Sequence, residues 1–350
     1  MADGAVGATR RKRQSTSNGK TTLREVAERA GVSHAAVSRA FTPGSPISDA
    51  MRARVIEAAE TLGYRPNRMA AGLAGGRSGL VGVVADGFGD PGLLELLDHA
   101  TGAMKGHGLI PILLNSEGQE TSDDILGVVH DYGIEALLLL SPSLSRRFVQ
   151  GIQKSGIRFA HAFEAHSADP AAPQAGVRDV LAARLAATTL SARGYARPAM
   201  IAGPEATRHF REPGNGFTTT LDRLGLPSRV VHAESWSPEA GARAMARLLA
   251  DSGCDAVFCA SDTLAIGALG AARAAGRAVP GEIGLIGYDD LPAAGWSGID
   301  LTTIGFPRAD IARHCVDFLA RLRDDPTLRP EASVTDPVLI ERGTLRPAQG

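Results

Sequence analysis

The stretch from Thr22 to Arg39 constrains the fold of this chain more than any other. Thr22 and Glu25 have the spacing of a capping box, in which two side chains satisfy free amides at the start of a helix. Apolar residues then recur at intervals of three and four, which predicts a short amphipathic helix. Gly31 follows, and glycine readily takes the left-handed conformation that ends helices.

A second helix is expected to begin after Ser33, whose side chain can cap free amides. Val37 would point inward. The exposed face would carry His34, Ala35, Ser38 and Arg39. A third helix is expected over residues 48–62. This pattern predicts a helix-turn-helix, whose second helix fits the major groove of DNA. An ordinary three-helix bundle without a nucleic-acid role is the alternative.

Charge is distributed unevenly along the 350 residues, which are enough for more than one domain. Residues 1–80 carry 13 Lys and Arg against 6 Asp and Glu, a net of +7, and the remainder carries 24 against 32, a net of −8. Only residues 1–80 therefore carry the positive net charge expected of a region that binds the phosphates of DNA. Residues 1–20 combine a basic run with small polar residues, and we expect them to form a disordered basic tail.

Several classes of site and location are not expected. The cysteines, Cys254, Cys259 and Cys315, match no zinc spacing and are expected to be buried thiols, so we expect no metal. P-loop, G-x-S-x-G and H-E-x-x-H motifs are missing, which argues against an enzyme and against a cofactor. The sequence contains no apolar run of membrane length and no secretion signal, so we expect a cytoplasmic protein.

From residue 78 onward, short apolar runs alternate with amphipathic segments. Strands are expected at 79–85, 109–115, 136–140, 158–163, 199–202, 229–233, 256–260 and 283–288. Nearly continuous apolar strands separated by helices predict parallel sheets covered on both faces. Two such series predict an α/β body of two doubly wound parallel-sheet subdomains. Ligands in this architecture bind beyond the carboxyl ends of the strands.

Motifs at 22–39, 62–68, 260–269, 279–290 and 301–304 occur in an order that resembles the LacI-type family of ligand-responsive transcription regulators. The similarity extends from Thr21 to Arg346. It implies a small all-α helix-turn-helix head followed by a periplasmic-binding-protein-like body. It also implies a homodimer, or a dimer of dimers, that binds an inverted-repeat DNA operator, because a two-fold protein matches a two-fold site.

The resemblance also implies domain boundaries. After the tail, a helix-turn-helix domain would span 21–66, a hinge 67–77, and an effector-binding and dimerisation domain 78–346. Within this last domain, subdomain 1 would comprise 78–168 and 306–323, and subdomain 2 would comprise 172–303 and 329–346. The chain would cross between them near 165–175, 303–307 and 323–330. Residues 334–340 would give a final strand to subdomain 2.

Carried over by position, the resemblance implies DNA contacts. The implied set is Thr22, Ser33, His34, Ala35, Ser38, Arg39, Asn67 and Leu73. Arg39 would bond the O6 and N7 atoms of guanine, and Ser33 and Ser38 would hold phosphate. Asn67 would cap a short hinge helix, from which Leu73 would push between base steps in the minor groove. Glycines in and after this segment predict a hinge that melts easily.

The resemblance further implies an effector site. Its expected residues are Asp90, Phe163, Arg211, Trp236, Asp262, Asp289 and Phe306. Asp262 matches the family's ligand aspartate, and a helix N-cap is its alternative role. Pro213 stands where relatives commonly have arginine, for which Arg208 or Arg211 could substitute, and Phe163 replaces a common aspartate. These departures favour an effector that is less hydroxylated or more apolar than an ordinary hexose.

A DNA-binding regulator controlled by a small molecule accounts for both parts of the chain. We expect a repressor that a sugar or related metabolite releases from DNA. A secreted solute-binding protein would share the body, but it would need an export signal and have no use for the head. A regulator that uses its effector as a corepressor fits the same residues.

Overall fold

The structure of the protein is a computed structural model that describes residues 21–42, 44–65, 78–85, 89–116, 122–140, 144, 146–162, 174–205, 211–251 and 253–348. The chain divides into two compact units, Met1–Ser78 and Gly79–Gly350, called the head and the body below. The expected tail at 1–20, the hinge at 67–77 with Asn67 and Leu73, and Phe163 lie outside the described residues, as does the side chain of Arg211.

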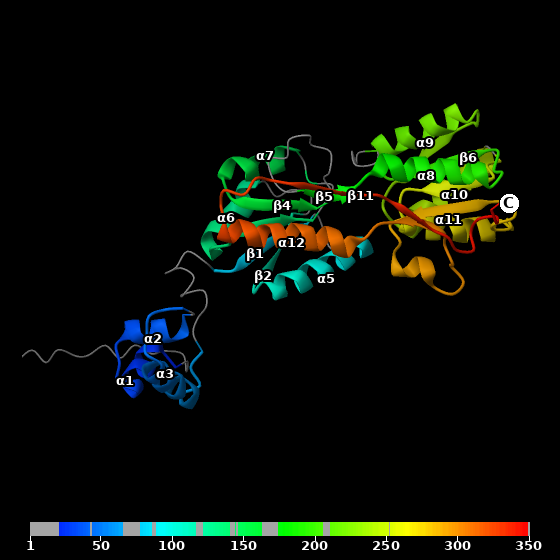
Figure 1. Ribbon diagram of the computed structural model, residues 1–350. Helices are drawn as coiled ribbons and strands as arrows, with labels where there is room; N and C mark the ends of the chain where they lie inside the picture. The colour runs from blue at the N-terminus through cyan, green and yellow to red at the C-terminus, as the bar shows by residue number, and fades with distance from the viewer. Residues whose placement is uncertain are drawn as a thin grey trace, which may run out of the picture. The chain divides into compact units, whose positions relative to one another are not determined.

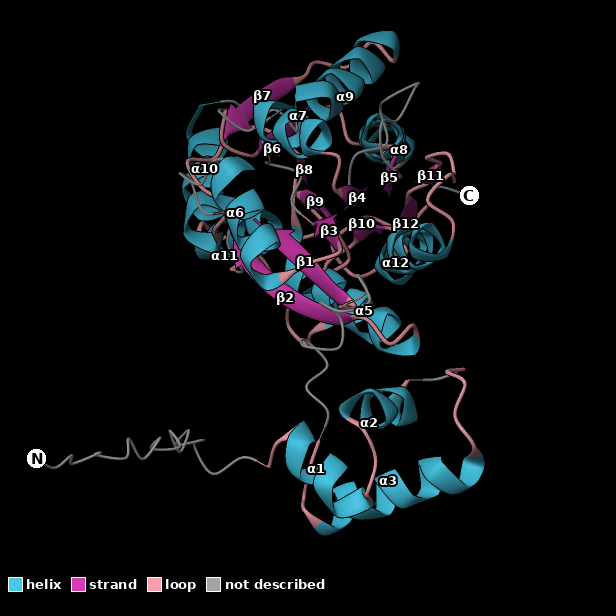
Figure 2. Ribbon diagram, turned by 90° about the vertical axis from the view of Figure 1, so that its left-hand side faces the viewer, coloured by secondary structure: helices cyan, strands magenta, loops and turns pink. Residues whose placement is uncertain are grey.

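The described part of the head contains three α-helices, α1 (Leu23–Ala30), α2 (His34–Phe41) and α3 (Asp49–Thr61) (Figure 2). The predicted capping box forms at the start of α1, where Glu25 Oε2 accepts the Thr22 amide at 2.6 Å. Gly31 has φ 63° and ψ 41°, the left-handed conformation that turns the chain into α2. The head core consists of Val26, Ala27, Ala30, Val37, Ala40, Val55, Ala58 and Ala59.

The first sheet of the body is parallel, and its described strands have the order β11-β5-β4-β3-β1-β2. The strands are β1 (Leu80–Ala85), β2 (Ile110–Asn115), β3 (Ala136–Leu139), β4 (Arg158–Ala162), β5 (Gln174–Val177) and β11 (Ala332–Thr335). The two faces are covered by the pairs α5 (Pro91–Gly106) with α12 (Arg308–Asp324), and α6 (Ser122–Tyr132) with α7 (Arg146–Ser155). Figure 1 shows α5 and α12 side by side.

The described strands of the second sheet have the order β12-β10-β9-β8-β6-β7. They are β6 (Pro198–Ala202), β7 (Arg229–His232), β8 (Ala256–Cys259), β9 (Gly284–Tyr288), β10 (Thr303–Gly305) and β12 (Val338–Ile340), of which β12 runs antiparallel to β10. The covering pairs are α8 (Asp179–Ala192) with α9 (Arg211–Arg223), and α10 (Pro238–Asp251) with α11 (Asp262–Ala274).

The strand orders confirm the expected fold class. Without β11 and β12, both sheets follow the doubly wound order 2-1-3-4-5, in which neighbouring strands β1 and β3, or β6 and β8, flank the point where the winding reverses. Ligands of such sheets bind at this point, beyond the carboxyl ends of the strands. The residues that follow β1, β6, β8 and β9 are therefore the ones that the fold offers to an effector.

Two expected subdomain boundaries need correction. β5 pairs with β4 in the first sheet, although residues from 172 onward were expected in subdomain 2. The single strand expected at 334–340 is two strands, because β11 pairs with β5 in the first sheet and β12 pairs with β10 in the second (Figure 1). Pro337 lies between β11 and β12, and a proline cannot donate the amide that a continuous ladder needs. β5 is four residues long, too short for its sequence to reveal its sheet.

Two further features of the described residues concern metals and membranes. Cys254, Cys259 and Cys315 are free and buried, as expected. Across the described ranges, His, Cys, Asp and Glu side chains form no cluster that could hold a metal ion. No helix in the same ranges has the length and apolarity to span a membrane.

Candidate DNA-reading face and effector site

α2 presents its predicted polar face to solvent. The exposed residues are Ser33, His34, Ala35, Ser38 and Arg39, and the buried ones are Ala36, Val37 and Ala40. The Ser33 hydroxyl oxygen caps the helix by accepting the Ala36 amide at 3.2 Å, so its own proton can still be donated. Arg39 Nε donates to the Ala35 carbonyl at 3.2 Å, so the arginine lies along the exposed side of α2.

Thr22 is exposed, but its side chain is used within the head. Its hydroxyl donates to Glu25 Oε2 at 3.0 Å and accepts the Glu25 amide at 3.4 Å. The pKa of the Glu25 carboxyl is lowered by these contacts with the Thr22 amide and hydroxyl. The structure thus gives Thr22 a role in starting α1, and its expected contact with DNA remains a prediction.

In the body, Asp90 follows the first strand and caps α5. Its Oδ1 accepts the amides of Gly92 at 2.7 Å and Leu93 at 3.0 Å, while the residue stays exposed. Such a cap stabilises the helix start by about 1 kcal/mol. Asp90 therefore has a structural role that is compatible with a second contact to a ligand.

Trp236 lies against the end of β6. A Cβ atom added to Gly203 would come within 2.1 Å of the indole ring. A larger residue at position 203 would therefore clash with the ring. Trp236 packs against the cores on both faces of the second sheet, which places it at the end of that sheet rather than on one side. The predicted aromatic residue is thus at a strand end, where the fold offers a ligand site.

Phe306 follows β10 and packs against a core of each sheet. Its ring centroid lies 5.6 Å from that of Tyr288. Tyr288 in turn donates its hydroxyl to Asp179 Oδ1 at 2.5 Å, and burial together with that carboxylate raises the pKa of Tyr288 well above its usual value. This part of the chain, where it passes from the second sheet to α12, is firmly packed.

Arg308, the first residue of α12, joins the two subdomains. It is 4% exposed, and its Nη1 donates to the Asp289 carbonyl while its Nη2 lies 3.3 Å from Asp289 Oδ1. Glu95 Oε2 on α5 is 3.6 Å from Nη1, and the guanidinium lies 4.6 Å from the Phe306 ring centroid. We call Arg308, Asp289 and Glu95 the Arg308 clasp, because they link α5 and α12 to the end of β9.

Asp289 is held in an unusual environment by this clasp. Its φ is 114°, in the region that non-glycine residues rarely adopt. Burial raises the pKa of its carboxyl well above the usual value, although the Arg308 charge acts in the opposite direction. Asp289 is thus the predicted effector residue with the most perturbed surroundings, which is typical of functional sites.

Asp262 differs from both of its expected roles. It is 0% exposed, and its two oxygens accept the Thr303 hydroxyl at 2.6 Å and the Leu291 amide at 2.7 Å. Ser261, not Asp262, caps α11 by accepting the Leu264 amide at 3.2 Å. Asp262 therefore fastens β10 and the loop after β9 to the start of α11, and in this structure it has no surface for a ligand.

Comparisons with known proteins agree with this geometry. Residues 22–67 match the family described as bacterial regulatory proteins, lacI family, and residues 187–345 match the periplasmic binding protein-like domain. The transcriptional regulator MalR of Streptomyces coelicolor is 29% identical over 94% of this chain and 98% of its own length. The Escherichia coli repressor CytR is also 29% identical, over 93% of this chain and 96% of its own.

Solved structures of transcriptional regulators share this fold. The lac repressor dimer bound to operator has a TM-score of 0.82 at 24% identity and covers 93% of this chain and 99% of its own. The complex of the transcriptional regulator CelR with cellobiose has a TM-score of 0.69 at 26% identity, over 93% of this chain and 100% of its own. The chain thus carries a DNA-binding domain of the lacI family and a periplasmic-binding-protein-like domain. It is a DNA-binding transcriptional regulator, and the relatives named above are regulators rather than enzymes.

Sequence reasoning did not single out every residue at the subdomain junction of this regulator. Arg308 and Asp179 were both missed, because neither belongs to a motif and each acts through a partner distant in sequence. The available signal was position alone, since Arg308 directly follows Phe306 and Pro307 at an expected crossing.

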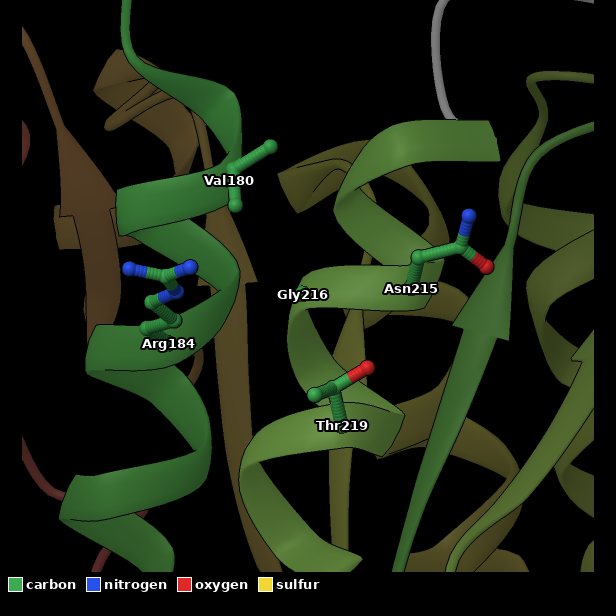
Figure 3. Close-up of a pocket in the computed structure, with 5 residues that line it drawn as sticks. All are labelled: Val180, Arg184, Asn215, Gly216 and Thr219. Atoms are coloured by element: carbon green, nitrogen blue, oxygen red, sulfur yellow. The ribbon is translucent and has the colours of Figure 1, made fainter. Parts of the chain in front are cut away.

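The regulator also has an open groove between α8 and α9. Figure 3 shows Val180 and Arg184 on α8, and Asn215, Gly216 and Thr219 on α9, around it. Gly216 allows the two helices to approach, since a Cβ there would lie 3.0 Å from the Val180 carbonyl oxygen. The described lining of this groove includes none of the predicted effector residues, so we do not place the effector there.

The burial of Asp262 predicts a pH effect on the regulator's stability. Desolvation raises the pKa of Asp262 from 3.8 to about 7, against the opposing hydrogen bonds from Thr303 and Leu291. Between these values the folded state holds a proton that the unfolded state has lost. This carboxyl therefore makes the free energy of unfolding fall as pH rises from about 4 to about 7.

The variant Asp262→Asn should remove this contribution, because its amide can accept from Leu291 and donate to Thr303 without carrying a charge. Relative to the wild type, we expect the variant to gain stability as pH rises, by about 2–4 kcal/mol between pH 4 and 8. Urea unfolding of both chains at several pH values measures the difference. A difference that stays constant over this pH range would contradict the prediction.

Proposed function

We propose that this regulator is a repressor that binds an inverted-repeat operator as a homodimer and is released by a small-molecule effector. The proposal rests on one observation above all. α2 carries a polar, exposed face, Ser33 to Arg39, on a head with net positive charge, and that head precedes a body built for ligand binding. Because an operator lies on chromosomal DNA, the proposal also implies that the protein works in the cytoplasm.

In this proposal α2 enters the major groove. Arg39 bonds guanine O6 and N7, His34 bonds a base edge and Ala35 contacts a thymine methyl group. Ser33 and Ser38 hold phosphate. The exposure of these side chains supports the roles, since none is needed by the core of the head. We retain Asn67 as the cap of a hinge helix and Leu73 as its minor-groove wedge, which are proposals from the sequence alone.

The effector in this proposal binds at the carboxyl ends of the strands, between the subdomains. Asp90, Trp236, Asp289 and Phe306 follow strands or precede the adjoining helices, which supports their inclusion. The cellobiose bound to CelR supports a sugar or a related metabolite as the effector class. Pro213, which replaces a common arginine, favours a less hydroxylated or more apolar compound over an ordinary hexose.

The experiment begins with selection of duplexes from a random-sequence pool by the purified full chain at moderate salt. Recovery of an inverted repeat supports the proposal, and failure to prefer any sequence over random duplex would refute it. Candidate metabolites are then added to the complex with the selected duplex. Release supports a repressor with an inducer, whereas tighter binding would show that the effector acts as a corepressor.

The variant Arg39→Ala should lose sequence discrimination on the selected duplex. One bidentate arginine–guanine contact contributes about 1–3 kcal/mol, so we expect the ratio of specific to random-duplex affinity to fall about 5- to 150-fold. Fluorescence anisotropy with both duplexes measures this ratio. Arg24→Ala is the control, because Arg24 lies on α1 and pairs with Glu28 at 2.8 Å. An unchanged ratio for Arg39→Ala would remove Arg39 from base reading.

A further inference from the structure

Arg52 on α3 reaches across the head to the end of α2. Its Nη1 donates to the Ala40 carbonyl at 2.5 Å, and its Nη2 donates to the Ser45 carbonyl at 3.4 Å. Arg52 is partly buried, unlike the exposed Arg54 two residues later on the same helix. The guanidinium thus connects three segments of the head, namely α2, the loop after it, and α3.

The carbonyl that Arg52 binds belongs to the last turn of α2. Ala40 precedes Phe41, the final helical residue, so its oxygen is among those that the helix itself leaves unsatisfied. A positive charge at a helix C-terminus also interacts favourably with the helix dipole. Arg52 therefore supplies both a hydrogen bond and a charge where α2 would otherwise fray.

This end of α2 is also the part that carries Arg39. Arg39 is adjacent to Ala40, and its carbonyl accepts the amide of Thr42, the C-cap residue, at 3.1 Å. Loss of the Arg52 contacts would release the Ala40 carbonyl and the loop together. The last turn of α2, and with it the Arg39 side chain, would then sample several positions instead of one.

We propose that Arg52 is a positioning residue for DNA recognition, which fixes the C-terminal turn of α2 and thereby aims Arg39 at its base. The proposal rests on the proposed function for the reading role of Arg39. It differs from a direct role in DNA binding, because both contacts of Arg52 are made inside the head. An arginine that contacted phosphate would instead contribute to affinity for every sequence alike.

The test uses the full-length variants Arg52→Gln and Arg52→Lys, with Arg54→Gln as the control that removes the same charge from the same helix. The probes are the duplex that the wild type selects and a scrambled duplex of equal composition. We expect Arg52→Gln to lower the ratio of specific to scrambled affinity at least 5-fold with an unchanged salt dependence of binding. Arg52→Lys, which keeps the charge but has a single donor nitrogen in place of the two that donate here, should recover part of the ratio, and Arg54→Gln should keep the wild-type ratio.

Amide hydrogen exchange on the DNA-free chain gives an independent measurement. In Arg52→Gln, the backbone amide hydrogens of residues 39–42 should exchange several-fold faster than in the wild type. The exchange rates of the α1 amides should stay unchanged. Two outcomes would overturn the proposal: unchanged protection at 39–42, or equal losses of affinity for both duplexes with a weaker salt dependence, which marks a phosphate contact. If the wild type selects no duplex at all, the proposed function fails, and the exchange measurement still decides whether Arg52 holds α2.

Discussion

Replacement of Val37 by aspartate should abolish DNA binding by the full chain while the body remains folded. Val37 is 0% exposed and belongs to a core made largely of alanine and valine. A buried carboxylate without a partner costs several kcal/mol, and a head of this size has only about 3–5 kcal/mol of stability to lose. The head and the body are separate compact units, so the loss should stay within the head.

Anisotropy with the selected duplex measures the loss of binding, and circular dichroism during thermal unfolding shows whether the body transition is retained. Ile56→Asp is the matched control, since Ile56 lies on α3 with 37% of its surface exposed. We expect this control to bind DNA within a few-fold of the wild type. Full DNA affinity in Val37→Asp would show that the head core differs from the one described.

The second large effect is expected from Arg308→Met in the Arg308 clasp. Methionine keeps much of the side-chain length but leaves Asp289 and Glu95 without the buried cation that faces both. Removal of one partner of a buried ion pair typically costs about 3–5 kcal/mol. We therefore expect the body to unfold at a clearly lower urea concentration at pH 8.

The size of this loss should depend on pH. Without Arg308, the pKa of Asp289 rises above its already raised value, so the folded state keeps the Asp289 proton up to a higher pH. The stability difference between the wild type and Arg308→Met should thus be smaller at low pH, where Asp289 is protonated in both chains, and should grow as pH rises. The double variant Arg308→Met/Asp289→Asn, which removes the unpaired carboxylate, should recover part of the loss.

Arg313→Met is the control for this experiment. Arg313 lies on the same helix, its side chain is 64% exposed, and it pairs with Asp310. Exposed pairs contribute little, so this variant should remain within about 0.5 kcal/mol of the wild type. If Arg308→Met behaved like Arg313→Met, the clasp would not hold the two subdomains together.

The head and the repeated strand-helix pattern could be predicted from the sequence, because both depend on residues close together in the chain. The capping box joins Thr22 to Glu25, and the inward position of Val37 follows from the helical period. The apolar runs likewise predicted buried parallel sheets. The strand orders of both sheets are doubly wound, as expected. The family resemblance implied Asp90, Trp236, Asp289 and Phe306 for the candidate site, and each of them follows a strand or precedes the adjoining helix.

The tertiary structure alone decided the roles that depend on distant partners. Asp262 follows a strand, as a ligand residue would, but Thr303, 41 positions later, and Leu291 enclose it. Arg308 gains its importance from Asp289, 19 positions earlier, and from Glu95 on another helix. β5 and β11 are recognised as strands of the first sheet only through their pairing. Periodicity reports which side of an element is apolar, whereas burial of a polar group depends on which distant segments fold against it.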